Sequence, residues 1–196
     1  MNFLAHLYLS KSNKNILIGN FIADAVKGNK HNNYPSEIQA GILLHREIDT
    51  YTDNHPIVRK SKRRLHQRYN HYDGVIIDIL YDHYLAKNWA HYSEIPLEVY
   101  ANSIYSFLNE NAQSFPSKIQ QILPYMIEHN WLVAYATTEG IGKILYGMNK
   151  RTKGISKMNL ATEDLKLYYN EFEDDFTTFF KDLEQFTNEK TTFLTI

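Results

Sequence analysis

The sequence contains no cysteine among its 196 residues. This absence excludes disulfide bonds, thiolate metal sites and a cysteine nucleophile. Long apolar runs are also missing, and none approaches the roughly 20 residues that a membrane-spanning helix needs. The opening segment MNFLAHLYLSKSNKN lacks the basic stretch and the small-residue cleavage site of a signal peptide. We therefore expect a cytoplasmic protein with no membrane partner.

Two widespread catalytic motifs are absent as well. Gly19 and Gly28 do not belong to a G-x-x-x-x-G-K-[ST] phosphate loop, and no serine lies in a G-x-S-x-G setting. The net charge is −1, so the chain as a whole has no basic character that would attract nucleic acid. These observations argue against a P-loop nucleotide-binding protein, a serine hydrolase and a nucleic-acid-binding protein.

What the chain does have is helical periodicity along most of its length. Its apolar fraction of 43% and charged fraction of 22% are ordinary for a globular protein. No pair of alternating strand patterns is joined by a tight turn. We predict an all-α protein in which residues 1–196 form a single domain, a bundle of about eight helices.

The expected helices share an apolar face and end at proline, glycine or polar breaks. They span residues 3–9, 16–28, 35–53, 59–69, 75–89, 96–108 and 160–186, and Pro116, Pro124 and Gly140 punctuate three more. Gly28 is expected to cap the second helix at its C-terminus, with Asn29 beside it.

The stretch HREIDTYTDNHP, residues 45–56, concentrates groups that bind metals. His45 and Asp49 are four residues apart and share one helix face, whereas Glu47 points to the other side. Imidazole and carboxylate together suit Mn, Fe, Zn or Mg. A bound divalent ion lowers the pKa of a coordinated water, so the constellation is competent for phosphoester hydrolysis. The alternative is a solvated helix face, since such pairs also occur by chance.

Other ionisable side chains lie in apolar surroundings. Asp78 and Asp82 repeat the spacing of four, and His83 follows directly, in the segment IDILYDHYLAKNW. A buried aspartate is costly unless it is paired or bound to metal. Asp24 in GNFIADAVKG is a similar case. His6 in NFLAHLYL is either a core histidine with satisfied hydrogen bonds or an additional site residue.

Charge is unevenly distributed along the chain. The run RKSKRRLHQR, residues 59–68, holds six Lys and Arg residues and no acid, and the segment 163–176 is mostly acidic. Each run is either a solvated helix face or, in the basic case, a docking surface for an acidic partner. The candidate docking residues are Arg59, Lys60, Arg63 and Arg64.

Four blocks of sequence occur in an order that resembles the acyl carrier protein phosphodiesterase family. They are MNFLAHLYLS at 1–10, GNFIADAVKG at 19–28, GILLHREIDTYTDNHP at 41–56 and YDHYLAKNW at 81–89. Two later segments, NWLVAY at 130–135 and GMNKR at 147–151, fit the same family. The last forty residues or so match it only in helical character. Tyr81 stands where the family pattern has tryptophan.

The resemblance implies an all-helical fold distantly similar to HD-domain phosphohydrolases, although the motif order differs from the usual H…HD…D. The implied activity, in fatty acid metabolism, hydrolyses holo acyl carrier protein to apo acyl carrier protein and 4′-phosphopantetheine, with Mn²⁺ as the metal. The carrier protein is small and acidic, which gives the basic run a partner.

The resemblance also assigns roles to individual positions. The metal ligands it implies are Asp24, His45, Asp82 and His83. Asp49 is expected to be a further ligand or the base that orients the attacking water. Independently of the resemblance, Arg46 is a candidate for stabilising the departing phosphate because it is next to His45.

Two other functions fit the same residues. One is an HD-like phosphohydrolase that acts on a nucleotide or another small phosphoester. The other is a non-catalytic protein that binds acyl carrier protein, with Asp24 and Asp82 as buried structural charges.

Overall fold

The computed structural model describes residues 1–194, and the regular secondary structure of this part of the chain is helical, without a strand. Eleven α-helices and six short 3₁₀ segments make it up. The predicted all-α class is confirmed. The helices outnumber the expected eight or so partly because short ones, α8 (Trp131–Ala134) and α10 (Ala161–Leu167), separate the longer ones. Residues 195 and 196 of the predicted domain lie outside the described residues.

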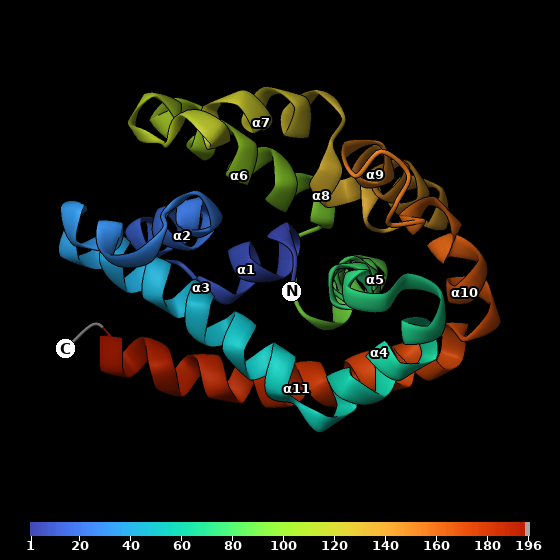
Figure 1. Ribbon diagram of the computed structural model, residues 1–196. Helices are drawn as coiled ribbons and strands as arrows, with labels where there is room; N and C mark the ends of the chain where they lie inside the picture. The colour runs from blue at the N-terminus through green and yellow to red at the C-terminus, as the bar shows by residue number, and fades with distance from the viewer. Residues whose placement is uncertain (195–196) are drawn as a thin grey trace.

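The first half of the chain and the C-terminal helix form one layer of the bundle. It consists of α1 (Phe3–Leu9), α2 (Lys14–Ile22), α3 (Ser36–Asn54), α4 (Pro56–Tyr69), α5 (Asp73–Lys87) and α11 (Tyr169–Leu194). In Figure 1, α3 runs diagonally below α1 and α2, and α11 crosses the lower part of the view, where it packs against α3 and α4. The N-terminus lies near the centre of the molecule, between α1 and α5.

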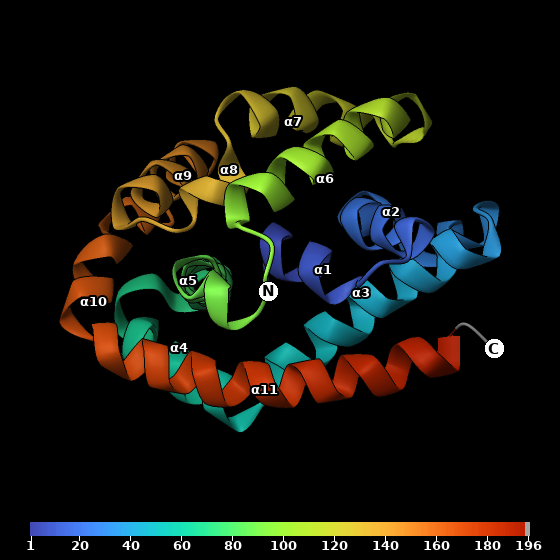
Figure 2. The same cartoon turned by 180° about the vertical axis from the view of Figure 1, so that it is seen from behind.

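The second half of the chain forms a cover above α1, α2 and α5. It consists of α6 (Leu97–Asn111), α7 (Ser117–Glu128), α8 and α9 (Thr138–Arg151), and α10 leads back to α11. Figure 2 shows this cover from behind, with α6 and α7 side by side above α2. Short 3₁₀ segments connect the helices: η1 (Ala23–Ala25), η2 (Gly28–Asn33), η3 (Asn70–Tyr72), η4 (Trp89–His91), η5 (Ala112–Ser114) and η6 (Met158–Leu160).

Three predicted helix boundaries are wrong. α2 ends at Ile22 rather than at Gly28, because Arg46 of α3 donates hydrogen bonds to the carbonyls of Val26 and Gly28 and holds this segment as a loop. Pro124 lies inside α7 instead of separating two helices. The long C-terminal helix is interrupted at Tyr168, where α10 ends and α11 begins.

Two glycines allow α2 and α3 to cross in backbone contact. A Cβ atom on Gly19 would lie 2.1 Å from the carbonyl oxygen of Ile38, and one on Gly41 would lie 2.2 Å from that of Ile16. Such distances are far below van der Waals contact, so only glycine fits at either position. The crossing places the end of α2 against the middle of α3, where His45 lies.

Replacing Gly41 by alanine should therefore destabilise the protein by roughly 1–3 kcal/mol, because α2 and α3 must move apart. For a chain of this size that lowers the melting temperature by about 2–12 °C. Thermal denaturation followed by circular dichroism measures it. Gly147→Ala is the matched control, since a Cβ atom on this helical glycine meets nothing within 4 Å. Equal melting temperatures for the two variants would contradict the prediction.

Candidate metal centre

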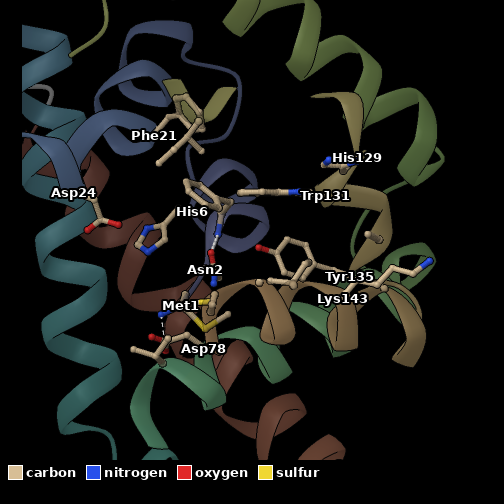
Figure 3. A pocket seen from close by; sticks show the side chains of 18 of the residues that line it. Met1, Asn2, His6, Phe21, Asp24, Asp78, His129, Trp131, Tyr135 and Lys143 are labelled. Atoms are coloured by element: carbon tan, nitrogen blue, oxygen red, sulfur yellow. Dashed lines mark hydrogen bonds and ion pairs between the residues drawn. The ribbon is translucent and has the colours of Figure 1, made fainter. Parts of the chain in front are cut away.

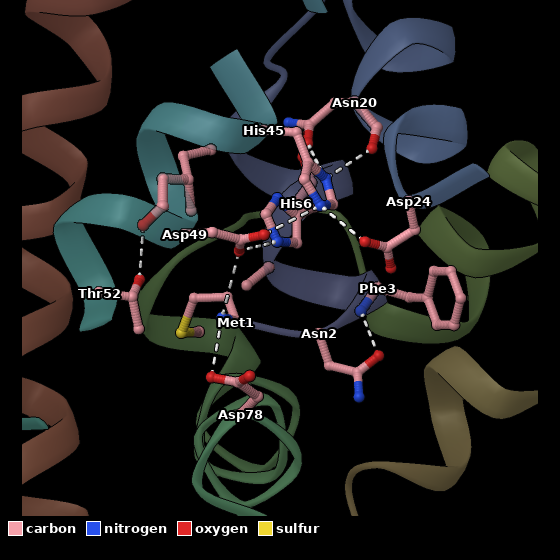
Figure 4. Close-up of polar contacts among 12 residues, drawn as sticks. Met1, Asn2, Phe3, His6, Asn20, Asp24, His45, Asp49, Thr52 and Asp78 are labelled. Atoms are coloured by element: carbon pink, nitrogen blue, oxygen red, sulfur yellow. Dashed lines mark hydrogen bonds and ion pairs between the residues drawn. The ribbon is translucent and has the colours of Figure 1, made fainter. Parts of the chain in front are cut away.

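Three ionisable side chains from two helices meet next to a large cavity. They are His6 from α1 and His45 and Asp49 from α3 (Figure 4). Asp49 Oδ2 lies 3.1 Å from His45 Nε2, and Asp49 Oδ1 lies 3.2 Å from His6 Nε2. One ligand atom from each residue lies within 4.8 Å of the others. This is the arrangement that a small cation needs, and we call these three residues the His–Asp cluster.

Asn20 of α2 orients the His45 ring. His45 Nδ1 lies 2.9 Å from the Asn20 carbonyl oxygen and 3.1 Å from Asn20 Oδ1, so it donates to this residue. The Asn20 amide in turn donates to the His6 carbonyl oxygen and to Ser10 Oγ, which fixes its own orientation. His45 Nε2 is thereby directed toward the cluster. A carbonyl on the other ring nitrogen is the usual support of a metal-binding histidine.

His6 is buried, with an exposed fraction of 4%, yet neither of its ring nitrogens has a hydrogen-bond partner among the described residues. Its Nε2 is near Asp49 without hydrogen-bond geometry. Its ring stacks on that of His45, with the centroids 3.9 Å apart. An unsatisfied buried polar group is costly and rare. His6 is therefore not a core histidine with satisfied hydrogen bonds, and a cation bound to its nitrogen would satisfy it.

The two histidines have opposite electrostatic properties. Burial lowers the pKa of His6 to about 4, so its imidazole is neutral at neutral pH. Burial also opposes charge on His45, but the facing carboxylates of Asp24 and Asp49 outweigh it and raise the pKa of His45 to about 9. Burial would raise the pKa of Asp49, but the two histidines hold that pKa well below its ordinary value. Without a metal, His45 is thus the positive charge of the cluster.

The raised pKa of His45 predicts how the stability of the metal-free protein depends on pH. His45 titrates near 6.5 in the unfolded chain and at about 9 in the folded one. Its contribution to stability is therefore complete below pH 6.5 and is lost as the pH rises toward 9, by up to about 1.4 kcal/mol per pH unit. Melting temperatures of EDTA-treated protein between pH 6.5 and 9 measure this. The His45→Gln variant should lack this part of the decline, and an identical decline in both proteins would refute the assignment.

Asp24 lies at the edge of the cluster. Its side chain is 69% exposed, and its Oδ1 is 3.4 Å from His45 Nε2. The expectation of a carboxylate within an apolar helix is wrong, because α2 ends before Asp24 and η1 turns this residue toward the cavity. Asp24 contacts one member of the His–Asp cluster and lies outside the group of three.

Asp82 is completely buried but does not reach the His–Asp cluster. Its carboxylate accepts hydrogen bonds from the backbone N–H groups of Asn2, Leu4 and Ala5, at 3.1, 2.8 and 3.4 Å. These are the free donors at the start of α1, where a negative charge is stabilised. Burial raises the pKa of Asp82 to about 7 despite these donors. Asp82 thus caps α1, and its burial is explained without a metal.

His83 is also held away from the cluster by the protein itself. Its Nδ1 donates to the Tyr135 carbonyl oxygen at 2.8 Å, and its Nε2 accepts from the Tyr169 hydroxyl at 3.0 Å. The structure therefore does not bring the predicted Asp82–His83 pair to the predicted site. Successive side chains of a helix point about 100° apart. α5 accordingly directs Asp82 toward α1 and His83 toward Tyr135.

Asp78, one turn before Asp82, is the carboxylate that α5 contributes to the cavity lining, next to Val75 of the same helix. It lies 2.9 Å from the Met1 ammonium group, which is itself 3.8 Å from Asp49. In the sequence, Asp78 stood out only because it lies four residues before Asp82, and it was not among the predicted metal ligands. Arg46 is likewise not in position to meet a phosphate, because its guanidinium holds the carbonyls of Val26 and Gly28.

Three of the six cationic residues of the basic run, Lys60, Arg64 and Arg68, form ion pairs with the acidic C-terminal helices. Lys60 lies 2.9 Å and Arg64 2.6 Å from the carboxylate of Asp175 on α11. Arg68 pairs in the same way with two acids at the start of α10. Two of the predicted docking residues thus have their charge matched within the fold. Arg59 and Arg63 are exposed, and neither forms an ion pair among the described residues.

The cavity beside the His–Asp cluster has a volume of about 1090 Å³ and lies between the two layers of the bundle (Figure 3). The aromatic rings of Phe21 and Trp131 line one part of it, and Lys118 and Arg151 contribute cationic groups. Its size is at the upper end of what small-ligand sites need. None of the helices in residues 1–194 has the length and apolar character required to cross a membrane.

Fold and site together define a class: an all-helical protein with a His–Asp cluster suited to a divalent cation beside a deep cavity. Comparison with known sequences gives the family. The profile described as acyl carrier protein phosphodiesterase matches residues 1–183. The chain belongs to this family, as its sequence blocks predicted.

Individual relatives can be aligned with nearly the whole chain. A protein of Pectobacterium atrosepticum named acyl carrier protein phosphodiesterase is 32% identical over 186 residues, which cover 94% of this chain and 96% of the relative. Proteins of the same name from Photorhabdus laumondii and Yersinia pestis are each 32% identical, covering 92% of this chain and 91% and 94% of their own. No solved structure matches the chain, so the likeness to HD-domain proteins stays a prediction.

Proposed function

We propose that this protein is a metal-dependent phosphodiesterase that hydrolyses holo acyl carrier protein to apo acyl carrier protein and 4′-phosphopantetheine. Family membership supports the carrier protein as substrate. The observation that carries the metal dependence is the unsatisfied imidazole of His6, buried against His45 and Asp49 beside the cavity.

The metal would be held by His6, His45 and Asp49, with Asp24 close enough to His45 to assist. This set differs from the one that the family resemblance implied, since Asp82 and His83 have protein partners for their polar atoms. Two imidazoles and a carboxylate suit Mn²⁺ among other divalent ions. When bound, such an ion lowers the pKa of a coordinated water and offsets charge on a phosphoryl oxygen.

The residues of the chain orient the reactants. Asn20 keeps His45 Nε2 directed at the cluster, and Asp49, besides holding the metal, would orient the attacking water through a carboxylate oxygen. In the reaction, the water oxygen bonds to phosphorus and the bond from phosphorus to the serine oxygen breaks. The serine oxygen gains a proton, and the phosphate leaves as a monoester of pantetheine.

The acidic carrier protein would meet the exposed arginines of α4. Arg59 and Arg63 remain available there, whereas Lys60 and Arg64 contact Asp175. The turn from α3 to α4 is near the cavity, because Thr52 and Asp53 contribute to its lining. A charged surface at this place would increase the rate of encounter more than the affinity.

The decisive experiment incubates the protein with holo acyl carrier protein and Mn²⁺. We expect the mass of the carrier protein to fall by that of the phosphopantetheine group, and EDTA to prevent the loss. Turnover of nucleotides without turnover of the carrier protein would favour a small-molecule phosphohydrolase, for which the cavity also has room. Tight binding of the carrier protein with neither bound metal nor cleavage would indicate a non-catalytic protein.

A further inference from the structure

One buried tyrosine differs from the others in the protein. The hydroxyl groups of Tyr69, Tyr81, Tyr84 and Tyr105 all form hydrogen bonds with protein groups. Tyr135 as a whole is also buried, with an exposed fraction of 1%, but its hydroxyl forms no hydrogen bond with another group in the described part of the chain. Unlike the ring nitrogens of His6, the Tyr135 hydroxyl oxygen is not enclosed by protein atoms, so this hydroxyl is open to the cavity that Tyr135 lines.

The position of this hydroxyl agrees with its accessibility from the cavity. Tyr135 lines the large cavity, and Figure 3 shows its hydroxyl directed toward Asn2 in the cavity interior. In this view His6 lies on the other side of Asn2. The Tyr135 hydroxyl, just after the end of α8, and the His–Asp cluster on α1 and α3 therefore face the same cavity.

The backbone around Tyr135 is fixed by several contacts. Its carbonyl oxygen accepts the hydrogen bond from His83 Nδ1 at 2.8 Å, and its N–H donates to the Trp131 carbonyl at 3.2 Å. Just before it, the Ala134 carbonyl packs against Gly140, where a Cβ atom would lie only 2.0 Å away. The phenol thus extends from a rigid support, which favours a precise role over a mobile one.

We propose that the Tyr135 hydroxyl donates a hydrogen bond to a phosphoryl oxygen of the substrate bound in the cavity. This inference rests on the proposed phosphodiesterase function and adds a catalytic residue to it.

The chemistry of the group fits this role. Burial raises the pKa of Tyr135 well above 10, so the hydroxyl keeps its proton and remains a donor at neutral pH. Charge on the phosphoryl oxygens must be balanced in a phosphodiester, and a fixed donor in a site that excludes water does so effectively. Removal of one such donor typically lowers turnover about 100-fold or more.

The test compares two conservative variants, Tyr135→Phe and Tyr84→Phe. Tyr135→Phe removes no hydrogen bond within the protein, so we expect an unchanged melting temperature and unchanged Mn²⁺ affinity. Its kcat/KM for holo acyl carrier protein should be about 100-fold lower. Tyr84→Phe loses the hydrogen bond to the Tyr169 carbonyl, so its melting temperature should be lower than that of the wild type. Its kcat/KM should stay within about twofold of the wild-type value. Wild-type kcat/KM in Tyr135→Phe would overturn the proposal.

A second measurement tests the role of the Tyr135 hydroxyl independently of whether holo acyl carrier protein is the substrate. Inorganic phosphate is titrated into the Mn²⁺-loaded wild type and the Mn²⁺-loaded Tyr135→Phe variant by calorimetry. A dissociation constant about tenfold higher in the variant supports the donor role even if holo acyl carrier protein is not cleaved. Equal dissociation constants would overturn it, whatever the natural substrate is.

Discussion

Replacing His45 by alanine is expected to abolish the hydrolysis of holo acyl carrier protein, with a loss of at least about 10³-fold. His45 is the central residue of the His–Asp cluster, because its Nε2 faces both Asp49 and Asp24 while its Nδ1 is fixed by Asn20. Without this imidazole, the cluster loses a ligand and the stacked partner of His6. Mn²⁺ affinity should fall together with activity.

The measurement combines calorimetric titration of Mn²⁺ with the carrier-protein assay. His91→Ala is a suitable control, since His91 is an exposed histidine in η4, outside the cavity. It should retain the metal affinity and activity of the wild type. Circular dichroism verifies that His45→Ala is folded. If folded His45→Ala binds Mn²⁺ and turns over like the wild type, the metal centre proposed here is wrong.

Replacing Asp82 by alanine should have its largest effect on stability. Three buried or partly buried N–H groups of α1 would lose their acceptor, which we expect to cost at least about 3 kcal/mol. The melting temperature should then fall by about 6–12 °C or more. The Mn²⁺ affinity of the protein that remains folded should stay within about threefold of the wild type.

Asp174→Ala, at an exposed position of α11, controls for the loss of one carboxylate. Asp82→Asn provides a milder change if the alanine variant does not fold, because the amide oxygen can still accept from α1. The prediction is wrong if the Asp82→Ala variant has wild-type stability without metal and binds Mn²⁺ about 100-fold more weakly than the wild type. Asp82 would then be a ligand, as the family resemblance implied.

One part of the candidate site could be predicted from the sequence because it depends on local periodicity. A helix repeats every 3.6 residues, so His45 and Asp49 had to share a face once α3 was identified. The same spacing marked Asp78 and Asp82. However, α5 is apolar around nearly its whole circumference, with Ile77, Leu80 and Tyr84 all fully buried. Periodicity therefore does not indicate which face of α5 points to the cavity. For this reason the sequence could not distinguish Asp78, at the cavity, from Asp82, which caps α1.

The charged runs show the same limit. Their composition predicted solvated faces or a docking surface, but α4 and the C-terminal helices neutralise one another through Lys60, Arg64 and Asp175. These partners are more than a hundred residues apart in the chain. Which charges meet is decided by helix packing, since local sequence carries no information about the neighbour across an interface.

The sequence by itself determined the all-helical class, the family and the pairing of His45 with Asp49, since each of these depends on residue order or on the spacing within one helix. Only the tertiary structure decided that His6 completes the cluster, that Asp82 caps α1 and that the Tyr135 hydroxyl faces the cavity. The physical reason is the crossing of α2 and α3 at Gly19 and Gly41, together with the packing of α1 and α8. These long-range contacts set the direction of each buried side chain.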